Sequence, residues 1–372
     1  MDNKKCSSCG SAMKRNGRTK AGSQRWRCGK CGASAVHGND TAARDLAAFS
    51  SWLLSKDSQA DMPGHGRTFR RRTASFWKIW PMPDVVDEVH RVVFVDGIWV
   101  ARNAVVLIAC TDSHVLSWHL ARAETSAAWK SLLSRIAPPD VVVTDGGSGF
   151  AKAVAAEWPQ TKVQRCVFHA FCQVNRCTTT RPKLQAGVEL YALAKELLRI
   201  ETPGQAEWWV ERFLQWSDFW SDFLNERSLV DGRLVYTHER LRKARRSLAS
   251  LIGAGTLFTY LDHELTMEGP LPATNNAIEG GVNAQLRAVL RNHRGLSEVK
   301  RIKAVFWWCY AHVECPKSMA RTLQEMPTDD DIELLRLQYG MNIEDAGVPA
   351  RWGEGLVWEE LHHKTSYPHS TE

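Results

Sequence analysis

Two aspartates in this sequence each follow a short run of β-branched and aromatic residues, and each precedes a glycine. Asp96 follows Arg91–Val95, and Asp145 follows Val141–Thr144. Such runs predict buried strands. A carboxylate at the end of a core strand costs free energy unless a metal ion or a neighbouring cation pairs with it. A surface turn aspartate is also common after a strand, so either aspartate taken alone leaves both interpretations open.

A third carboxylate, Glu279, lies in the first turn or so of a helix that the sequence predicts to start near Pro272. Asn283 and Arg287 follow on the same helical face. Alone, Glu279 is also consistent with an ordinary first-turn residue favoured by the helix dipole. Together, the three carboxylates suit phosphodiester chemistry, in which two Mg²⁺ ions about 3.5–4 Å apart activate an oxygen nucleophile and neutralise the leaving oxygen.

The composition predicts a soluble globular protein of two or three domains. The chain has 372 residues, of which 44% are hydrophobic and 24% are charged. No apolar run is long enough for a membrane span. The N-terminus is polar and basic without an apolar core, so no signal peptide is expected. We therefore expect a cytoplasmic protein with no membrane partner.

The charge of the chain is unevenly distributed. Residues 1–80 hold 16 Lys and Arg against 5 Asp and Glu, whereas the whole chain has a net charge of +7. The remaining residues are therefore mildly acidic. A basic N-terminal part attached to an acidic body suggests a polyanion-binding module.

Two C-x-x-C pairs lie at the start of the chain, and their spacing predicts a structural zinc site. They are Cys6/Cys9 and Cys28/Cys31, and each pair can bind one side of a tetrahedral ion. The sequence thus predicts a zinc ribbon over residues 1–38, with a disulfide framework as the alternative. Basic residues between the pairs, including Arg25 and Arg27, suit phosphate contacts, although a solvated basic face is also possible.

Residues 39–83 predict three helices in a helix-turn-helix. Thr41 is placed to cap the first helix, Ser58–Met62 is the second, and Thr68 is placed to cap the third. Basic residues in the first turn of the third helix suit the major groove of DNA, and a plain basic helix is the alternative. The expected DNA contacts are Arg67, Thr68, Arg70 and Arg71.

The remaining residues predict an α/β protein whose core is interrupted. Residues 84–177 give three meander strands and then helix–strand–helix–strand, the order of an RNase H-like core. Residues 178–271 predict an all-helical insertion, residues 272–315 complete the core with the Glu279 helix, and residues 316–372 form a C-terminal tail. An aromatic stripe in the insertion is typical of a core, but one of its tryptophans could stack on an extruded base. A basic helix that begins near His238 offers Arg242 and Arg245 to a DNA backbone.

Several segments also resemble a known family. They are VFVDG with Asp96, VVTDGGSGF with Asp145, QRCVFHAF with Cys166 and His169, YTHERLRKARRSL at 236–248, and TNNAIEGGVNAQLRAVLRNHRGLS with Glu279. The chain resembles bacterial insertion-sequence transposases of the IS256/Mutator-like superfamily, particularly the zinc-ribbon-bearing IS1249-type branch, over nearly its whole length. The 49 residues from Asp96 to Asp145 and the 134 more to Glu279 fit that group, which carries an all-helical insertion.

The resemblance implies that Asp96, Asp145 and Glu279 bind two Mg²⁺ ions, for which Mn²⁺ can substitute. It places Cys166 and His169 near the site, with metal ligation by that pair as one option and a packed turn as the other. His293 and Arg294 become candidates for holding DNA near Glu279.

The expected function is that of a DDE transposase. It would bind the terminal inverted repeats, cleave DNA to a 3′-OH and join that end to target DNA, as a dimer or larger assembly on paired ends. Two rivals stay open: a DNA-binding regulator without catalysis, and another RNase H-like nuclease such as a resolvase.

Overall fold

The computed structural model describes residues 4–6, 11–20, 22–30, 32, 34–36 and 42–343, with side chains through residue 338. The chain divides into two compact units. The first comprises Met1–Trp52, Asp57–Phe76 and Lys317–Glu325, and the second comprises Leu53–Lys56, Trp77–Pro316 and Met326–Glu372.

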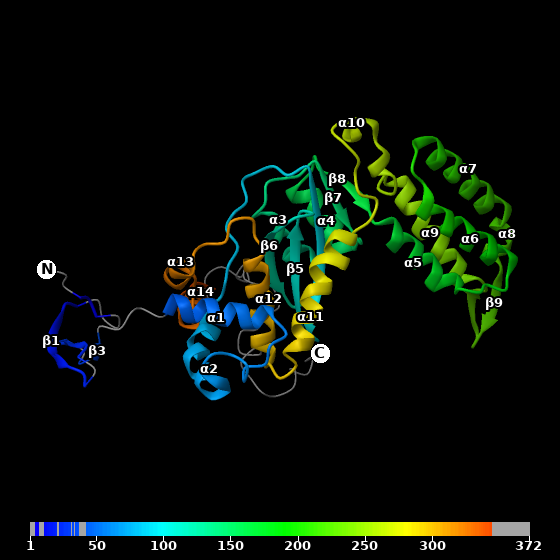
Figure 1. Ribbon diagram of the computed structural model, residues 1–372. Helices are drawn as coiled ribbons and strands as arrows, with labels where there is room; N and C mark the ends of the chain where they lie inside the picture. Colours follow the sequence, from blue (N-terminus) through cyan, green and yellow to red (C-terminus); the bar gives the residue numbers. More distant parts are fainter. Residues whose placement is uncertain are drawn as a thin grey trace. The chain divides into compact units, whose positions relative to one another are not determined.

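The first unit begins with a small antiparallel sheet (Figure 1). Its strands, in spatial order, are β1 (Met13–Arg18), β2 (Gln24–Cys28) and β3 (Ser34–Val36). Cys6 and Cys28 are buried with Met13 in a core of few residues. So small a core supplies little stability by itself, which is the situation in which a structural metal is needed. Cys9, Cys31 and Thr41 lie outside the described residues.

The described part of residues 39–83 forms two α-helices where the sequence predicted three. They are α1 (Ala42–Leu54) and α2 (His65–Thr73), the second followed by the 3₁₀ helix η1 (Ala74–Lys78). The predicted helix Ser58–Met62 is wrong: the Asp61 carboxylate accepts hydrogen bonds from the Ser58 backbone N–H and hydroxyl, which closes a turn. Such local side-chain bonds compete with helix formation.

The helix α2 also begins earlier than predicted. It starts at His65, directly after Gly64 in a left-handed conformation with φ of 92°, so Thr68 lies inside its first turns and is not the cap. Phe49 of α1 contacts Phe76, and Trp52 contacts Phe69 edge-on. Arg72 of α2 pairs with the buried Asp45 of α1. The helix α13 (Met319–Glu325) also belongs to this unit.

The second unit is built on a five-stranded mixed sheet. The strands are β4 (Val92–Ala101), β5 (Ala104–Cys110), β6 (Val115–Ala121), β7 (Val141–Thr144) and β8 (Lys162–Arg165). Their spatial order is β6-β5-β4-β7-β8. The first three form the predicted antiparallel meander, whereas β4, β7 and β8 are parallel. The α/β class predicted from the sequence is confirmed.

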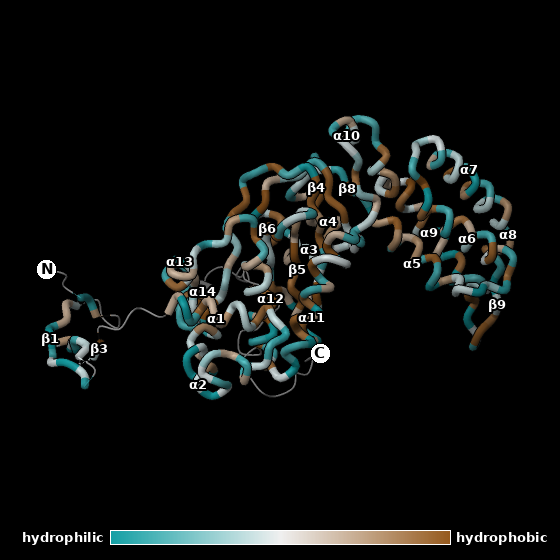
Figure 2. The backbone as a smooth tube through the Cα atoms, in the orientation of Figure 1, coloured by the Kyte–Doolittle hydropathy of each residue, from teal (hydrophilic) through white to brown (hydrophobic). Residues whose placement is uncertain are grey.

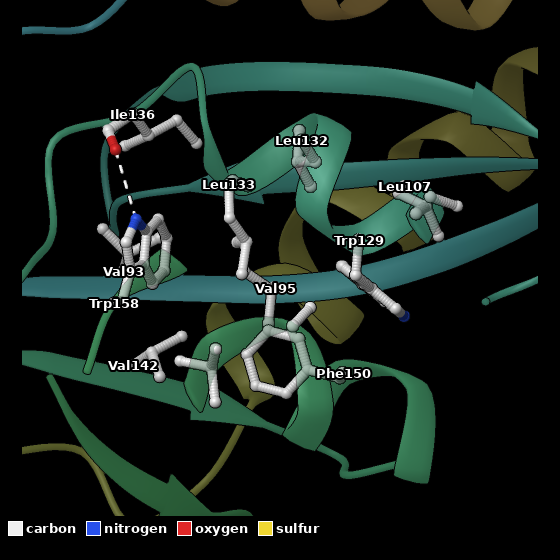
Figure 3. Close-up of a cluster of buried hydrophobic side chains, with 14 of the residues drawn as sticks. Val93, Val95, Leu107, Trp129, Leu132, Leu133, Ile136, Val142, Phe150 and Trp158 are labelled. Atoms are coloured by element: carbon white, nitrogen blue, oxygen red, sulfur yellow. Dashed lines mark hydrogen bonds between the residues drawn. The ribbon is translucent and has the colours of Figure 1, made fainter. Parts of the chain in front are cut away.

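Helices cover both faces of this sheet (Figure 1). The helices α3 (Ser126–Leu133) and α4 (Ser148–Glu157) pack on one face, and α12 (Glu298–Ala311) packs on the other, where Phe306 meets Trp118 of β6 edge-on. Figure 3 shows the α3–α4 side, with Val95 of β4 among Leu133 and Phe150. There the Trp158 indole donates a hydrogen bond of 3.2 Å to the Ile136 carbonyl.

The insertion follows β8. Its helices are α5 (Val167–Thr178), α6 (Gln185–Glu196), η2 (Leu197–Arg199), α7 (Pro203–Phe219), α8 (Ser221–Asn225) and α9 (Glu239–Gly253). Three members of the aromatic stripe, Trp209, Phe213 and Trp216, are buried and stack in series. Part of the stripe is therefore core, as predicted, while Trp208 and Phe219 are exposed and Trp220 and Phe223 are half-buried.

The prediction of an all-helical insertion is wrong, because a β-hairpin lies between α8 and α9. Its strands are β9 (Arg227–Val230) and β10 (Arg233–Tyr236). Asp231 and Gly232 form the two-residue turn with φ values of 48° and 74°. An Asp-Gly pair between apolar residues is a strong hairpin signal because this turn needs positive φ at both positions. The exposed leucines and valines at the hairpin contribute to its hydrophobic colour in Figure 2.

The chain returns to the sheet through short helices. They are η3 (Thr259–Leu261), α10 (His263–Thr266), the π-helix η4 (Ala277–Asn283) and α11 (Ala284–Asn292), before α12 and, later, α14 (Asp329–Ile343). The fully buried Lys303 of α12 donates hydrogen bonds to Asp329 at the start of α14 and to the Trp77 carbonyl. Among the helices of the described residues, none combines the length and apolar character needed to cross a lipid bilayer.

Candidate active site

Asp96 lies in the middle of β4 and not at its end. The sequence predicted that the strand stops at Val95, but it continues through Gly97 to Ala101, since Ile98 and Val100 are buried and extend the pairing with β5. The parallel pairing with β7 does stop at Val95. Asp96 therefore sits at the point where β4 loses its β7 neighbour, which opens the sheet on that side.

Asp145 follows the last residue of β7, at the same level of the sheet. Thr144, the residue before Asp145, is aligned with Val95, the residue before Asp96, in the parallel pairing of β7 and β4. Gly146 then adopts a φ of 90°, a conformation that residues with side chains rarely adopt. A Cβ at Gly146 would overlap the guanidinium of Arg165 from β8. The glycine thus lets Arg165 reach close to Asp145. Arg165 was not among the residues predicted from the sequence.

Glu279 is presented by the π-helix η4 and not by a regular α-helix. Single turns of π-helix are rare and are found often at functional sites. Asn275 anchors the start of this segment: its side-chain amide donates to the Val95 carbonyl at 3.2 Å, and its backbone N–H donates to the Cys166 thiol at 3.3 Å. At the other end, Asn283 donates a 2.6 Å hydrogen bond to a carboxylate oxygen of Asp96.

The three carboxylates interact electrostatically. Burial raises the pKa of Asp96 to about 7, and the charges of Asp145 and Glu279 add to that effect against the hydrogen bond from the Gly97 N–H. Burial also raises the pKa values of Asp145 and Glu279. The structure therefore places the three carboxylates that the sequence singled out within electrostatic range of one another, although their oxygens do not all lie within 4.8 Å of one another. Their mutual repulsion would favour binding of a divalent cation.

Glu124 is a fourth carboxylate at this place, and the sequence analysis missed it. One of its oxygens accepts a 3.1 Å hydrogen bond from the Trp99 indole. The same oxygen would lie 2.8 Å from a Cβ at Gly97. Partial burial and the charge of Asp145 raise the pKa of Glu124. Nothing in its surrounding sequence, ARAETS, separates it from an ordinary helix-preceding acid.

Cys166 and His169 lie beside Glu279. Cys166 is buried at the start of α5, and His169 lies in the first turn of that helix. The His169 Nδ1 atom is 3.1 Å from Glu279 Oε1. A hydrogen bond with the Cys166 side chain, and then the charge of Glu279, raise the pKa of His169 against the effect of burial. The C-x-x-H step is thus part of the site.

Several buried polar atoms at the site form no hydrogen bond with the rest of the described chain. They are His169 Nδ1, Asn275 Oδ1, Glu279 Oε1 and Asn283 Oδ1, of which His169 Nδ1 and Glu279 Oε1 lie within ion-pair distance of each other. Buried polar atoms normally have a partner, and a site where several lack one calls for a bound ion or water. Within the described residues, no lysine or arginine forms an ion pair with Asp96, Asp145 or Glu279. Hard carboxylate and amide oxygens of this kind fit Mg²⁺.

The residues expected to contact DNA lie in different environments. Six of them are exposed: Arg25 and Arg27 on β2, Arg67, Thr68, Arg70 and Arg71 on α2. Arg294, after α11, is exposed too, but the neighbouring His293 is buried and its Nε2 lies 2.9 Å from the Leu53 carbonyl.

In the insertion, the two arginines differ in availability. The Arg242 guanidinium bonds to the Leu224 carbonyl and the Asn225 side chain, stacks over Tyr236 at 3.5 Å, and leaves its side chain 12% exposed. Arg245 is partly exposed. The geometry of His293 and Arg242 therefore favours structural roles.

A family model described as "Transposase, Mutator family" matches residues 87–197. The matched segment runs from just before β4 through α6, and it contains Asp96, Asp145, Cys166 and His169, while Glu279 lies beyond it. No curated protein matches the chain. The match supports a Mutator-family transposase, and hence a DNA-processing enzyme, as the sequence resemblance predicted.

Proposed function

We propose that this protein is a DDE transposase of an insertion sequence. It binds the terminal inverted repeats, cleaves DNA to leave a 3′-OH, and joins that end to target DNA. The observation that carries the proposal is the convergence of Asp96, Asp145 and Glu279 from β4, the end of β7 and η4, within a segment that in part matches Mutator-family transposases.

The strand order supports an RNase H-like core for the proposed enzyme. A three-strand antiparallel meander joined to two parallel strands, in the order β6-β5-β4-β7-β8, is the arrangement expected of that fold. In it the two aspartates come from adjacent strands, and the glutamate comes from a helix after the insertion. This layout keeps three acidic side chains together although they are far apart in the sequence.

The residues that would hold Mg²⁺ are Asp96, Asp145 and Glu279. Two bound ions would activate an oxygen nucleophile and neutralise charge on the leaving oxygen, and Mn²⁺ could replace them. The chain itself orients the carboxylates. The Gly97 N–H and the Asn283 amide each donate to one oxygen of Asp96, so this side chain is held in one rotamer before any ion binds.

Water and the freed 3′-OH would use the same site in turn. Neither step needs a covalent protein–DNA intermediate, so no serine or tyrosine nucleophile is required of the chain. Arg165, which packs on Gly146 beside Asp145, is placed to attract a phosphate group.

The N-terminal residues would bind the DNA ends. The exposed arginines of β2 and α2 form a basic surface, and the buried Cys6 and Cys28 lie at positions consistent with a zinc ribbon completed by Cys9 and Cys31. A helix-turn-helix formed by α1 and α2 and an IS1249-type ancestry belong to the same proposal. Synapsis of two ends would need a dimer or a larger assembly.

A cleavage and strand-transfer assay tests the proposal. The purified full-length protein is mixed with a labelled duplex that carries the element's own end, with Mg²⁺ or with EDTA. We expect metal-dependent nicking at the end. The Glu279→Gln variant should lose nicking but retain end binding in a gel-shift assay, because the substitution removes a ligand charge and leaves the N-terminal residues unchanged.

The matched control is Glu268→Gln, an acidic residue outside the site on the loop before Pro270. It should cleave like the wild type. Tight end binding without cleavage by the wild type, even with Mn²⁺ and a target plasmid, would instead support a DNA-binding regulator.

A further inference from the structure

Cys166, His169 and Glu279 bring three different metal-binding atoms together. One ligand atom from each residue, a sulfur, a ring nitrogen and a carboxylate oxygen, lies within 4.8 Å of the other two. The residues come from two segments more than 100 positions apart, the start of α5 and the π-helix η4. Among the described residues, no other set of three or more His, Cys, Asp and Glu side chains brings its ligand atoms this close together.

The contact between His169 and Glu279 has the geometry of two ligands without their ion. Nδ1 and Oε1 are 3.1 Å apart, which is ion-pair distance when His169 is protonated, and neither atom forms a hydrogen bond with any other group in the described chain. Zinc–nitrogen and zinc–oxygen bonds of about 2.0–2.2 Å place two ligands of a tetrahedral ion roughly 3.3–3.6 Å apart. The observed separation is close to that range.

The donor types decide which cation suits the group. Mg²⁺ prefers oxygen ligands, whereas thiolate and imidazole suit zinc and similar transition metals. A cysteine, a histidine and a carboxylate match the mixed ligand sets of zinc sites with one open position. The backbone N–H of Asn275 donates to the Cys166 sulfur at 3.3 Å, and such outer hydrogen bonds orient metal ligands.

We propose that Cys166, His169 and Glu279 form a binding site for one transition-metal cation of the zinc class. This cation is distinct from the Mg²⁺ of the proposed reaction, but both would be bound by the carboxylate of Glu279. The site therefore acts as an inhibitory one: zinc bound there withdraws Glu279 from Asp96 and Asp145. This last step rests on the proposed function, whereas the binding itself does not.

Cobalt titration of the metal-free, full-length protein tests the binding. Co²⁺ reports thiolate ligation by a charge-transfer band, and the four cysteines near the N-terminus contribute a band of their own. We therefore compare the wild type with Cys166→Ser and His169→Gln. The wild type should bind one more equivalent of Co²⁺ than either variant, and the difference spectrum should contain a thiolate band.

Cys172→Ser is the matched control, since Cys172 lies on the same helix outside the group. It should titrate like the wild type, and circular dichroism checks that each variant is folded. Equal Co²⁺ stoichiometry in the wild type and both site variants would overturn the proposed site.

Zinc inhibition is measured separately, as the ratio of Mg²⁺-dependent cleavage with and without micromolar Zn²⁺. Zn²⁺ should slow cleavage at least about tenfold in the wild type and in the Cys172→Ser control. In the Cys166→Ser variant, Zn²⁺ should slow cleavage much less. Cobalt binding without zinc inhibition would refute the inhibitory role. Absence of cleavage in every protein, with the Co²⁺ difference present, would count against the proposed function and leave the metal site supported.

Discussion

Asn283 donates a 2.6 Å hydrogen bond to Asp96, a residue 187 positions earlier in the chain. Asn283 is fully buried at the end of the π-helix that carries Glu279, and Asp96 lies in the central strand. This bond ties the segment after the insertion to the sheet before it. It fixes the position of Glu279 relative to Asp96 independently of any metal.

Replacing Asn283 by Ala should impair cleavage more than folding. Hydrogen bonds to charged groups are worth about 1.5–3 kcal/mol, which corresponds to roughly a 10- to 100-fold loss of rate if the orientation of Asp96 matters for the reaction. Single-turnover nicking measures the rate, and a gel shift measures end binding. Asn292→Ala, at an exposed position of α11, is the control and should react normally. A normal rate for Asn283→Ala would show that Asp96 needs no such anchor.

Replacing Gly146 by Ala should destabilise the protein and disturb the site. A Cβ at this position would overlap the Arg165 guanidinium, and φ is 90°. Gly255→Ala is an informative comparison, because Gly255 has a φ of 65° but open space around it. The Gly255→Ala variant should be destabilised only by backbone strain, which lowers the free energy of unfolding by about 1–2 kcal/mol.

Urea unfolding of both glycine variants separates crowding from strain. Gly146→Ala should unfold at a clearly lower urea concentration than Gly255→Ala and should also nick DNA more slowly. Equal unfolding midpoints would mean that Arg165 moves aside at no cost.

The buried His119 should contribute a loss of stability on acidification, against the opposite effect of Asp96, whose raised pKa favours the folded state as the pH falls. Burial lowers the pKa of this β6 histidine from 6.5 to about 4, so the unfolded chain binds a proton that the folded chain does not. The contribution of His119 to the free energy of unfolding is therefore intact above pH 6.5 and declines as the pH falls towards 4, by up to about 3 kcal/mol.

Urea unfolding at pH 7.5 and at pH 4.5 measures this effect. His119→Gln removes the titration of this group, so the free energy of unfolding at pH 4.5, relative to that at pH 7.5, should be higher in that variant than in the wild type. His263→Gln, at an exposed position of α10, should keep the full difference. An unchanged pH dependence in His119→Gln would assign the acid sensitivity to other groups.

Much of the core could be predicted from local sequence. The strands β4, β5, β6 and β7 are mostly apolar or β-branched runs, which are typical of strands covered on both faces, whereas β8 has the mixed sequence KVQR. Asp96, Asp145 and Glu279 were recognisable because each stands next to such a run or a helix start. The end of β4 was misplaced, because a single Asp-Gly step inside a long strand resembles a strand end.

The parts that could not be predicted depend on contacts between distant segments. Glu124 and Arg165 reach the site only through glycine positions on other elements, Gly97 and Gly146. The π-helix at Glu279 likewise depends on the bonds of Asn275 and Asn283 to β4. In contrast, the Asp231-Gly232 hairpin carried a clear local signal that was overlooked among helical patterns.

The two ends of the insertion meet at the edge strand β8. Arg165 N–H donates to the Thr256 carbonyl, and the buried Gln164 side chain bonds to Leu257 and Tyr260 on the returning chain. The segment from α5 to Thr256 therefore leaves the sheet and returns to it at the same strand, where hydrogen bonds hold its two ends together. Evolution or protein engineering could lengthen, trim or exchange its outer helices and hairpin without shifting the sheet. The chain can in this way acquire new contact surfaces while Asp96, Asp145 and Glu279 keep their mutual geometry.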